Sequence, residues 1–208
     1  MAEVERLVVG PAATNCYILK SGEELAVIDP GGDPEEIVAR AKKLGGTVKY
    51  VIDTHGHIDH IAANREVVEA TGAELLVHEL DAVMLTSPDR NLSSLFGMPL
   101  ESPAAARTLR EGDVVKVGEE EMTVYHTPGH TPGGMCLIGG SFAFTGDTLF
   151  VDSVGRVDFP GGSETRMMAS LQRLQGLLKR DMMLYPGHGE PGTFGRALLV
   201  NQFLGSAY

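Results

Sequence analysis

The run THGHIDH at 54–60 constrains the fold of this chain more than any other feature, and it directly follows an apolar segment, VKYVID. Three of the seven histidines of the chain fall in this run: His55, His57 and His60. Protonating one imidazole disfavours protonating its neighbour, so a surface loop gains nothing from such crowding. Asp59 adds a carboxylate to the group. The run therefore predicts a bound cation, and the chain must fold so that further ligands reach this position.

The spacing within the run predicts two ion positions. Residues two apart in an extended segment point the same way, so His55 and His57 can bind one ion. Asp59 and His60, at the start of the following helix, would point to a second position. Downstream ligands are predicted where other segments end, namely His130 in HTPGHTPGG, Asp147 in FAFTGDTLF and His188 in YPGHGEPGT. Nitrogen and oxygen ligands in sets of about four suit zinc, iron or manganese better than calcium or magnesium.

Seven side chains are thus expected to hold two divalent ions, with zinc preferred and iron or manganese as alternatives. The assignment gives the first ion His55, His57 and His130, and the second ion Asp59, His60 and His188. Asp147 is expected to bridge the ions, because a buried carboxylate at a strand end is costly unless it is paired with a cation. Asp59 and Asp147 are the predicted catalytic residues, and Asp59 would also orient a metal-bound hydroxide. His78 and His126 lack a partner motif and are predicted to be structural.

Strand and helix signals alternate along most of the chain. Strands are predicted over 5–10, 16–20, 25–29, 48–53, 73–78, 113–117, 122–126, 134–138, 141–147 and 182–188, and helices over 34–44, 60–71, 163–178 and 193–204. Residues 86–107 lose periodicity and predict a long, mobile loop over one end of the fold, which could form one wall of a pocket. The chain begins with strands and continues with helices interleaved with strands, and this pattern occurs twice. Such an order favours a four-layer αββα sandwich. No segment reads as a linker, so 1–208 is predicted to be one domain.

Charge and hydropathy exclude several classes of partner. The net charge is −11, and the chain has no block of lysine or arginine that could follow a phosphate backbone, so nucleic acid is disfavoured. No apolar run is long enough to span a membrane, and the N-terminus lacks the pattern of a secretory signal, which predicts a cytoplasmic protein without a membrane partner. The oligomeric state stays open.

The order of four motifs resembles a known family. THGHIDH, PGHTPGG, TGDTLF and PGHG occur in the order typical of the metallo-β-lactamase superfamily. Within it, GDTLFVDSVGRVDFPGGS and GHGEPGTFGRALLVNQFL are similar to a compact glyoxalase II-like group. That resemblance implies the αββα fold, the two-metal ligand set assigned above and thioester hydrolysis as the parent activity. The expected substrate is a small acyl compound.

The chain also departs from glyoxalase II enzymes. Those enzymes carry an additional helical C-terminal domain that helps to hold glutathione, whereas this chain is expected to lack it. They have a lysine and a tyrosine where this chain has Arg156 and Asp158, and a tyrosine where it has Glu190. These differences leave recognition of glutathione open.

A second activity is implied by GRVDF, which resembles the persulfide dioxygenases of the same superfamily. Those enzymes use a single iron, for which His55, His130 and Asp147 would be the matching ligands. Lactone or phosphodiester hydrolysis is a further alternative, and the acidic balance disfavours the phosphodiester. A module that only stores metal is disfavoured too, because the glycines around His130 and His188 leave room for a ligand.

Two further residues have open roles. Arg156 is predicted to contact a substrate carboxylate or phosphate, since its planar guanidinium pairs with such groups in bidentate fashion. The alternative is an internal salt bridge with Asp152 or Asp158. Asp29 either supports the histidine run from the end of its strand or caps the following helix.

Overall fold

The computed structural model describes residues 2–205 and contains two six-stranded sheets. The first sheet has the order β1 (Glu3–Val9), β2 (Thr14–Ser21), β3 (Glu24–Ile28), β4 (Thr47–Asp53), β5 (Glu74–His78) and β6 (Arg107–Leu109). The second has the order β12 (Gly192–Thr193), β11 (Met183–Pro186), β10 (Phe142–Gly146), β9 (Met135–Ile138), β8 (Glu120–His126) and β7 (Val114–Val117). The helices are α1 (Pro34–Leu44), α2 (Ile58–Ile61), α3 (Asn64–Thr71), α4 (Ala82–Leu85), α5 (Glu164–Leu177), α6 (Phe194–Val200) and the 3-10 helix η1 (Gln202–Leu204).

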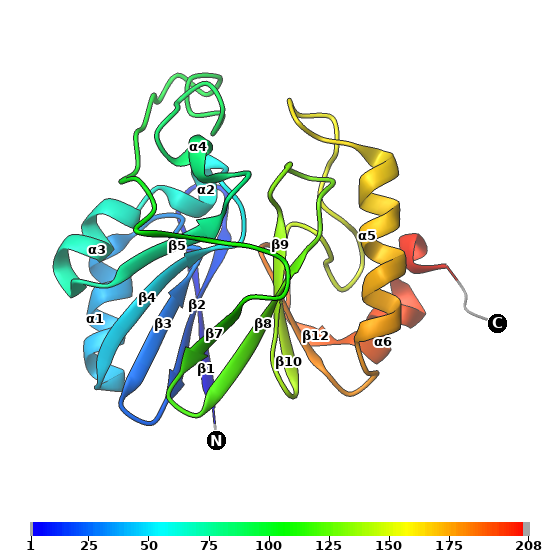
Figure 1. Cartoon of the computed structure of the whole chain (residues 1–208), viewed down its shortest axis with the longest axis horizontal. Helices are drawn as coiled ribbons and strands as arrows, with labels where there is room; N and C mark the ends of the chain where they lie inside the picture. The colour runs from blue at the N-terminus through cyan, green and yellow to red at the C-terminus, as the bar shows by residue number, and fades with distance from the viewer. Residues whose placement is uncertain (1, 206–208) are drawn as a thin grey trace.

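The two sheets lie face to face with helices on both outer sides (Figure 1), as the predicted αββα sandwich requires. Three apolar cores match these layers. One core packs α1 and α3 against the first sheet, the second fills the space between the sheets, and the third packs α5 and α6 against the second sheet. The middle core holds large buried side chains such as Tyr17, Ile52 and Phe144. Their burial fixes how the sheets face each other and therefore how the strand ends align.

The strands that precede the predicted ligands all run toward one edge of the sandwich. In the first sheet β3, β4 and β5 are parallel neighbours. In the second sheet β10 and β11 are parallel, and β8 has the same direction because each antiparallel pairing through β9 reverses it. Carboxyl ends of parallel strands meet at one edge, which is where open α/β sheets place their ligands. This topology carries residues that are far apart in sequence to a single rim.

Two predicted helices are interrupted. The helix expected over 60–71 is divided into α2 and α3, because the backbone N–H of Ala63 donates to the carbonyl oxygen of Pro30 (2.8 Å) and not to a helical partner. Buried Asn64, the first residue of α3, donates its side-chain amide to Asp53 (2.8 Å) and to Ser102 (3.0 Å). The helix expected over 193–204 ends at Val200, since the Asn201 amide donates to the carbonyl oxygens of Phe150 and Ser153 at 3.0 and 2.8 Å. In both places the chain bonds to a segment that is distant in sequence, so a tertiary contact interrupts the helix.

The other long helices follow the sequence prediction. Helix α1 has the predicted bounds and is followed by Gly45. Helix α5 begins after Ser163, whose hydroxyl accepts a hydrogen bond from the backbone N–H of Arg166, as expected of an N-cap. The short elements α4, β6 and β12 were not predicted, and they are too brief for periodicity to reveal them.

The segment 86–107 crosses the rim of the sandwich above α2 and α4 (Figure 1). It has no regular element before β6, and it is held by buried polar side chains. The Asn91 amide donates to the carbonyl oxygen of Leu100 (3.0 Å), and the Ser93 hydroxyl accepts from the Leu100 N–H (2.9 Å). Within residues 2–205, no helix is long and apolar enough to cross a membrane.

Candidate metal centre

The run THGHIDH lies between β4 and α2, with its three histidine side chains buried. The end of β4 places His55 and His57 in the loop, and α2 carries Asp59 and His60. His55 and His57 meet His130, which comes from the loop after β8, and the ligand atoms of these three residues lie within 4.8 Å of one another. This group has the membership predicted for the first ion.

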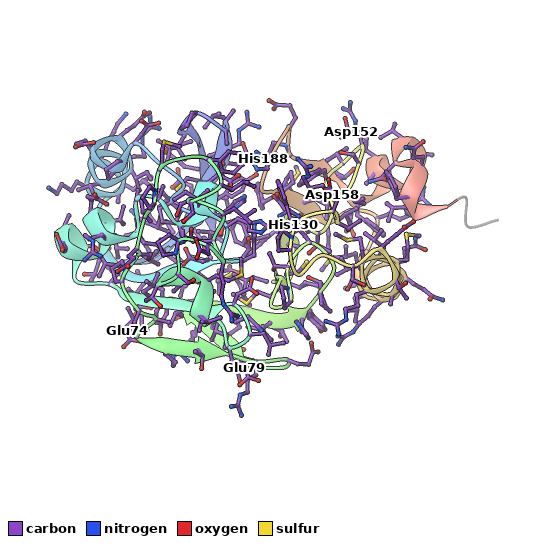
Figure 2. All side chains as sticks on the ribbon, turned by 90° about the horizontal axis from the view of Figure 1, so that it is seen from above. Glu74, Glu79, His130, Asp152, Asp158 and His188 are labelled. Carbon is purple, nitrogen blue, oxygen red and sulfur yellow. The ribbon has the colours of Figure 1, made fainter. Side chains whose placement is uncertain are left out.

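A second group forms beside the first. The ligand atoms of Asp59, His60 and His188 also lie within 4.8 Å of one another. His188 follows β11, and its Nε2 lies 3.2 Å from Asp59 Oδ2. In the view from above, His130 and His188 lie near the middle of the molecule, where its two halves meet (Figure 2). The group has the membership predicted for the second ion.

Asp147 lies between the two groups, directly after β10. Its Oδ1 is 3.5 Å from His60 Nε2, whereas its Oδ2 is 3.5 Å from His130 Nε2 and 3.6 Å from His188 Nε2. One carboxylate therefore faces histidines of both groups. This geometry fits the predicted bridge, and its role as a ligand stays a prediction.

A hydrogen bond on one ring nitrogen of His130 orients the ring so that its other nitrogen points toward the ligand cluster. His130 Nδ1 lies 2.7 Å from the carbonyl oxygen of Arg156, which can only accept a hydrogen bond, so Nδ1 carries the proton. The Nε2 of His130 then faces the cluster, and it lies 2.8 Å from His57 Nδ1. A hydrogen-bonded outer nitrogen of this kind is the usual support of a metal-binding histidine.

Several ligand atoms that point into the cluster have no hydrogen-bond partner within residues 2–205. His55 Nε2, His60 Nε2 and Asp147 Oδ1 are buried and have no hydrogen-bond partner among the described residues. A buried polar atom without a partner costs about 1–3 kcal/mol, more when it is charged. A cation between these atoms would satisfy all of them, so the donor set fits divalent ions that accept nitrogen and oxygen ligands.

The ionisation states of the ligand side chains favour a bound cation. Burial lowers the pKa of His55 well below its ordinary value, and burial and the neighbouring His130 lower that of His57 to about 3. Both imidazoles are therefore neutral, which is the form that binds a metal. His60 behaves differently: burial alone would lower its pKa, but neighbouring carboxylates, chiefly Asp147 and Asp29, outweigh burial and raise it to about 10. Without a metal, a proton on His60 partly balances these carboxylates.

Asp29 supports ligands of both groups. Its Oδ2 lies 3.0 Å from His60 Nδ1 and also accepts a hydrogen bond from the Thr54 hydroxyl at 2.8 Å. The Thr54 oxygen in turn lies 3.3 Å from His55 Nδ1, and the Thr54 N–H donates to Asp29 Oδ1 at 2.7 Å. Of the two roles considered from sequence, the structure has Asp29 in contact with the histidine run, and Asp33 occupies the N-cap position of α1.

Sequence reasoning missed Asp81, which joins two ligand loops. This fully buried carboxylate accepts from the Gly56 N–H (3.1 Å) in the histidine run and from the Thr131 hydroxyl (2.7 Å) and Gly133 N–H (2.6 Å) next to His130. The available signal was an acidic residue shortly after the strand β5, the same placement that Asp147 has after β10. Its partners are distant in sequence and gave no motif.

Asn15 was also missed, and it clamps the loop that carries His188. Its buried amide donates to the carbonyl oxygens of Pro186 (2.9 Å) and Gly189 (2.7 Å), on either side of the histidine. The backbone of this loop also passes close to two predicted ligands at Gly187, where a Cβ would collide with the Asp147 carboxylate and the His60 ring. On the exposed side, Arg6 pairs with Glu190 through two hydrogen bonds of 2.8 and 2.9 Å.

We predict that Asn15→Ala weakens binding of the second ion selectively. The substitution removes two hydrogen bonds, each worth about 0.5–1.5 kcal/mol, and it loosens the loop of His188 but not that of His130. The Tyr17 hydroxyl still donates to the Pro186 oxygen, so the loop keeps part of its support. Titration of metal-free protein with cobalt(II), followed by absorption, should show one tight and one weakened step. Arg6→Ala serves as the comparison and should change the second step less, because exposed ion pairs contribute about 0.2–1 kcal/mol. Equal weakening of both steps in Asn15→Ala would contradict this role.

Arg156 lies in the lining of a cavity of about 850 Å³ that opens over the ligand cluster. Its guanidinium pairs with Asp158 through hydrogen bonds of 2.7 and 2.6 Å and covers the ring of Phe159 at 4.0 Å. The internal salt bridge considered from sequence is therefore present, with Asp158 as the partner. A contact of Arg156 with substrate stays a prediction.

The two histidines predicted to be structural belong to neither group. His78 and His126 stack on each other with 4.3 Å between ring centres, and His126 Nε2 lies 2.8 Å from the carbonyl oxygen of Pro132. The segment 86–107 contributes Leu92, Phe96, Met98 and Leu100 to the cavity lining, so it forms one wall of the pocket as predicted.

Comparison with known proteins identifies the family. The model described as metallo-beta-lactamase superfamily matches residues 9–188, so the chain belongs to that superfamily. Among its relatives, hydroxyacylglutathione hydrolase GloC from Haemophilus influenzae is 32% identical over 210 residues, covering 98% of each chain. Among solved structures, BLEG-1 B3 metallo-beta-lactamase superposes with a TM-score of 0.92 at 32% identity, covering 97% of this chain and 99% of the other. TTHA1623 in a di-iron-bound form superposes with a TM-score of 0.85 at 33% identity, covering 96% and 100%.

Proposed function

We propose that this protein is a metal-dependent hydrolase that cleaves a thioester or related acyl bond, with two divalent ions, preferably zinc. The observation that carries the proposal is the set of ligand groups at the floor of an open cavity: the two groups described above and a third, formed by His55, His60 and Asp147, that shares a residue with each of them. His55, His57 and His130 would hold the first ion, and Asp59, His60 and His188 the second, with Asp147 shared. The similarity to GloC, a hydroxyacylglutathione hydrolase, supports the acyl chemistry.

The cavity lining supports water as the nucleophile. Among the described residues that line it there is no serine, threonine, cysteine, lysine or tyrosine. Cys16 and Cys136 are buried elsewhere, and burial raises the pKa of the Cys136 thiol to about 11. When bound, two divalent ions lower the pKa of coordinated water from about 15.7 to about 7 and polarise a carbonyl group.

Two carboxylates have the positions that the reaction needs. Asp59 has a side chain that is 31% exposed and reaches the cavity, where it can accept a hydrogen bond from the attacking water and orient it. Asp147 is 9% exposed and faces both histidine groups. In the overall reaction, the oxygen of water bonds to the carbonyl carbon, the carbon–sulfur bond breaks, and a proton passes to the departing thiolate. The products are a carboxylic acid and a thiol.

The second candidate is a persulfide dioxygenase with one iron held by His55, His130 and Asp147. The similarity to a protein solved in a di-iron-bound form favours iron as a metal for this ligand set. The two candidates share these ligands, and the group of Asp59, His60 and His188 would give the hydrolase the position for its second ion. The cytoplasmic setting and the small-molecule substrate stay predictions.

The test is hydrolysis of a panel of thioesters, lactones and phosphodiesters by protein loaded separately with zinc, iron and manganese, after the metals have been quantified. We expect two ions per chain and turnover of thioesters. One iron per chain with oxygen uptake on glutathione persulfide would replace the proposal by the dioxygenase. A fully loaded protein that cleaves only phosphodiesters would overturn it as well.

We predict that removal of the ions with a chelator lowers the melting temperature. An ion that binds only the folded state stabilises it by about 2.7 kcal/mol when present at a hundred times its Kd. For a domain of this size that corresponds to a shift of about 5–11 °C. Differential scanning calorimetry before and after treatment, with zinc added back as the control, measures the change. An unchanged melting temperature would argue against any contribution of the ions to stability.

A further inference from the structure

The cavity above the ligand cluster has two apolar walls. One wall comes from the segment 86–107, where Phe96 and Met98 are 55% and 58% exposed, and the other from the segment between β10 and α5, with Phe150 and Phe159. Large apolar side chains are exposed here although a folded chain gains by covering them. Their place around a cavity indicates that a ligand covers them.

The second wall adjoins both ion positions. The ring of Phe159 packs edge-on against His57 with 5.8 Å between ring centres, and the ring of Phe150 packs edge-on against His188 with 6.2 Å. An acyl group whose carbonyl lies at the ions would therefore extend along apolar side chains from its first carbon atoms. Burial of such a chain is favourable in proportion to the apolar area that leaves water.

Apart from the ions proposed at its floor, the cavity offers little to an anionic group. Arg156 is the only lysine or arginine among the described lining residues, and both of its hydrogen bonds go to Asp158. Asp33, whose carboxylate accepts from the Gly10 N–H, adds a negative charge to the lining. Glutathione carries two carboxylates, and recognition of such groups relies on available cations. This lining therefore favours a substrate recognised through an uncharged, apolar part.

We propose that the cavity binds an aliphatic or aryl acyl group of medium length and that recognition of the substrate does not depend on glutathione. The proposal rests on the hydrolase function and narrows its substrate class. The metal ligands set where the carbonyl lies, and the walls of the cavity, above all Phe96, Met98, Phe150 and Phe159, select the acyl chain.

The test is a series of N-acetylcysteamine thioesters with acetyl, butanoyl, hexanoyl and octanoyl groups, and the same acyl groups on glutathione. With zinc-loaded protein we expect kcat/KM to rise with chain length, by up to about fourfold for each methylene that becomes buried. We expect the ratio of octanoyl to acetyl kcat/KM to exceed ten, and to be similar for the two thiols. A flat series, or a preference above tenfold for glutathione that Arg156→Ala abolishes, would overturn the inference and leave the hydrolase standing.

Two variants separate the wall from general effects. Phe96→Ser alters an exposed side chain of the wall, and it should lower the octanoyl-to-acetyl ratio at least threefold. Leu199→Ser is the matched control, because Leu199 is an exposed apolar residue (78%) on α6 and does not line the cavity, so the ratio should stay unchanged. An unchanged ratio in Phe96→Ser would contradict a role of this wall.

A binding measurement tests the apolar cavity without relying on turnover. S-alkyl N-acetylcysteamine thioethers of the same chain lengths cannot be hydrolysed, and calorimetric titration gives their Kd with zinc-loaded protein. Tighter binding with each added methylene, weakened in Phe96→Ser, supports the apolar site. A Kd that does not change with chain length overturns it. If the loaded protein cleaves no thioester, the proposed hydrolase function is wrong. The thioether series then tests by itself whether the cavity binds apolar chains.

Discussion

Replacing Asp147 with asparagine should reduce hydrolysis more than 100-fold and lower the metal content at both ion positions. The two oxygens of Asp147 face His60 on one side and His130 on the other, at 3.5 Å each, so the loss of its charge affects both groups. Residues that only support ligands change affinity or activity by about 10–100-fold, and a shared ligand should exceed that range. Metal content by mass spectrometry and turnover of a thioester measure the two effects.

Asparagine keeps the size of the side chain, so the variant should fold, which a melting curve checks. Asp152→Asn is the control, because Asp152 is an exposed acid in the same segment after β10 and does not line the cavity. It should keep two ions per chain and full activity. Asp147→Asn with full metal occupancy would contradict the bridging role, whatever its activity.

Replacing Asp29 with asparagine should weaken binding of both ions by about 10–100-fold, the range found for residues that orient metal ligands. Asp29 does not line the cavity, and it acts through other residues. It lies 3.0 Å from His60 Nδ1, and through the Thr54 hydroxyl it reaches His55 Nδ1. An amide lacks the charge that holds a proton on His60 Nδ1, so the ring loses its fixed orientation. Cobalt(II) titration should show both steps weakened.

A matched control separates orientation of ligands from the general effect of changing a buried acid. Asp53 is also fully buried at this rim, but its side chain bonds to the Asn64 amide. Burial, and next the neighbouring Asp29, raise the pKa of Asp53 well above its ordinary value, which disfavours its charged form, so Asp53→Asn should change the charge of the site less than Asp29→Asn does. That variant should keep the wild-type Kd for both ions. Equal weakening in the two variants would contradict a specific role of Asp29.

That these side chains come together could be predicted because they share a local signature. His55, Asp147 and His188 each stand just beyond an apolar strand, and strands that run in one direction deliver their ends to one rim. Residues that each follow a strand in the sequence therefore become neighbours in the fold, because the strands run in the same direction and end at the same edge. The same reasoning gave the layers, because the alternation of strands and helices limits the ways in which apolar faces can be covered.

The supporting residues could not be predicted in this way. Asn15 is the second residue of the strand β2, and its role depends on a loop more than 170 residues away in sequence, to which its amide donates. Asp81 likewise acquires its function only when two loops meet. The break before Asn64 and the end of α6 at Asn201 depend on hydrogen bonds to distant segments, which helical periodicity does not contain. Tertiary hydrogen bonds decide each of these cases.

The most direct test of the two-ion site is anomalous diffraction from a crystal of zinc-loaded protein. We predict two ions per chain, one bound by His55, His57 and His130 and the other by Asp59, His60 and His188, with Asp147 in contact with both. A single ion at full zinc loading, or an Asp147 or His188 side chain that faces away from the cluster, would contradict this account.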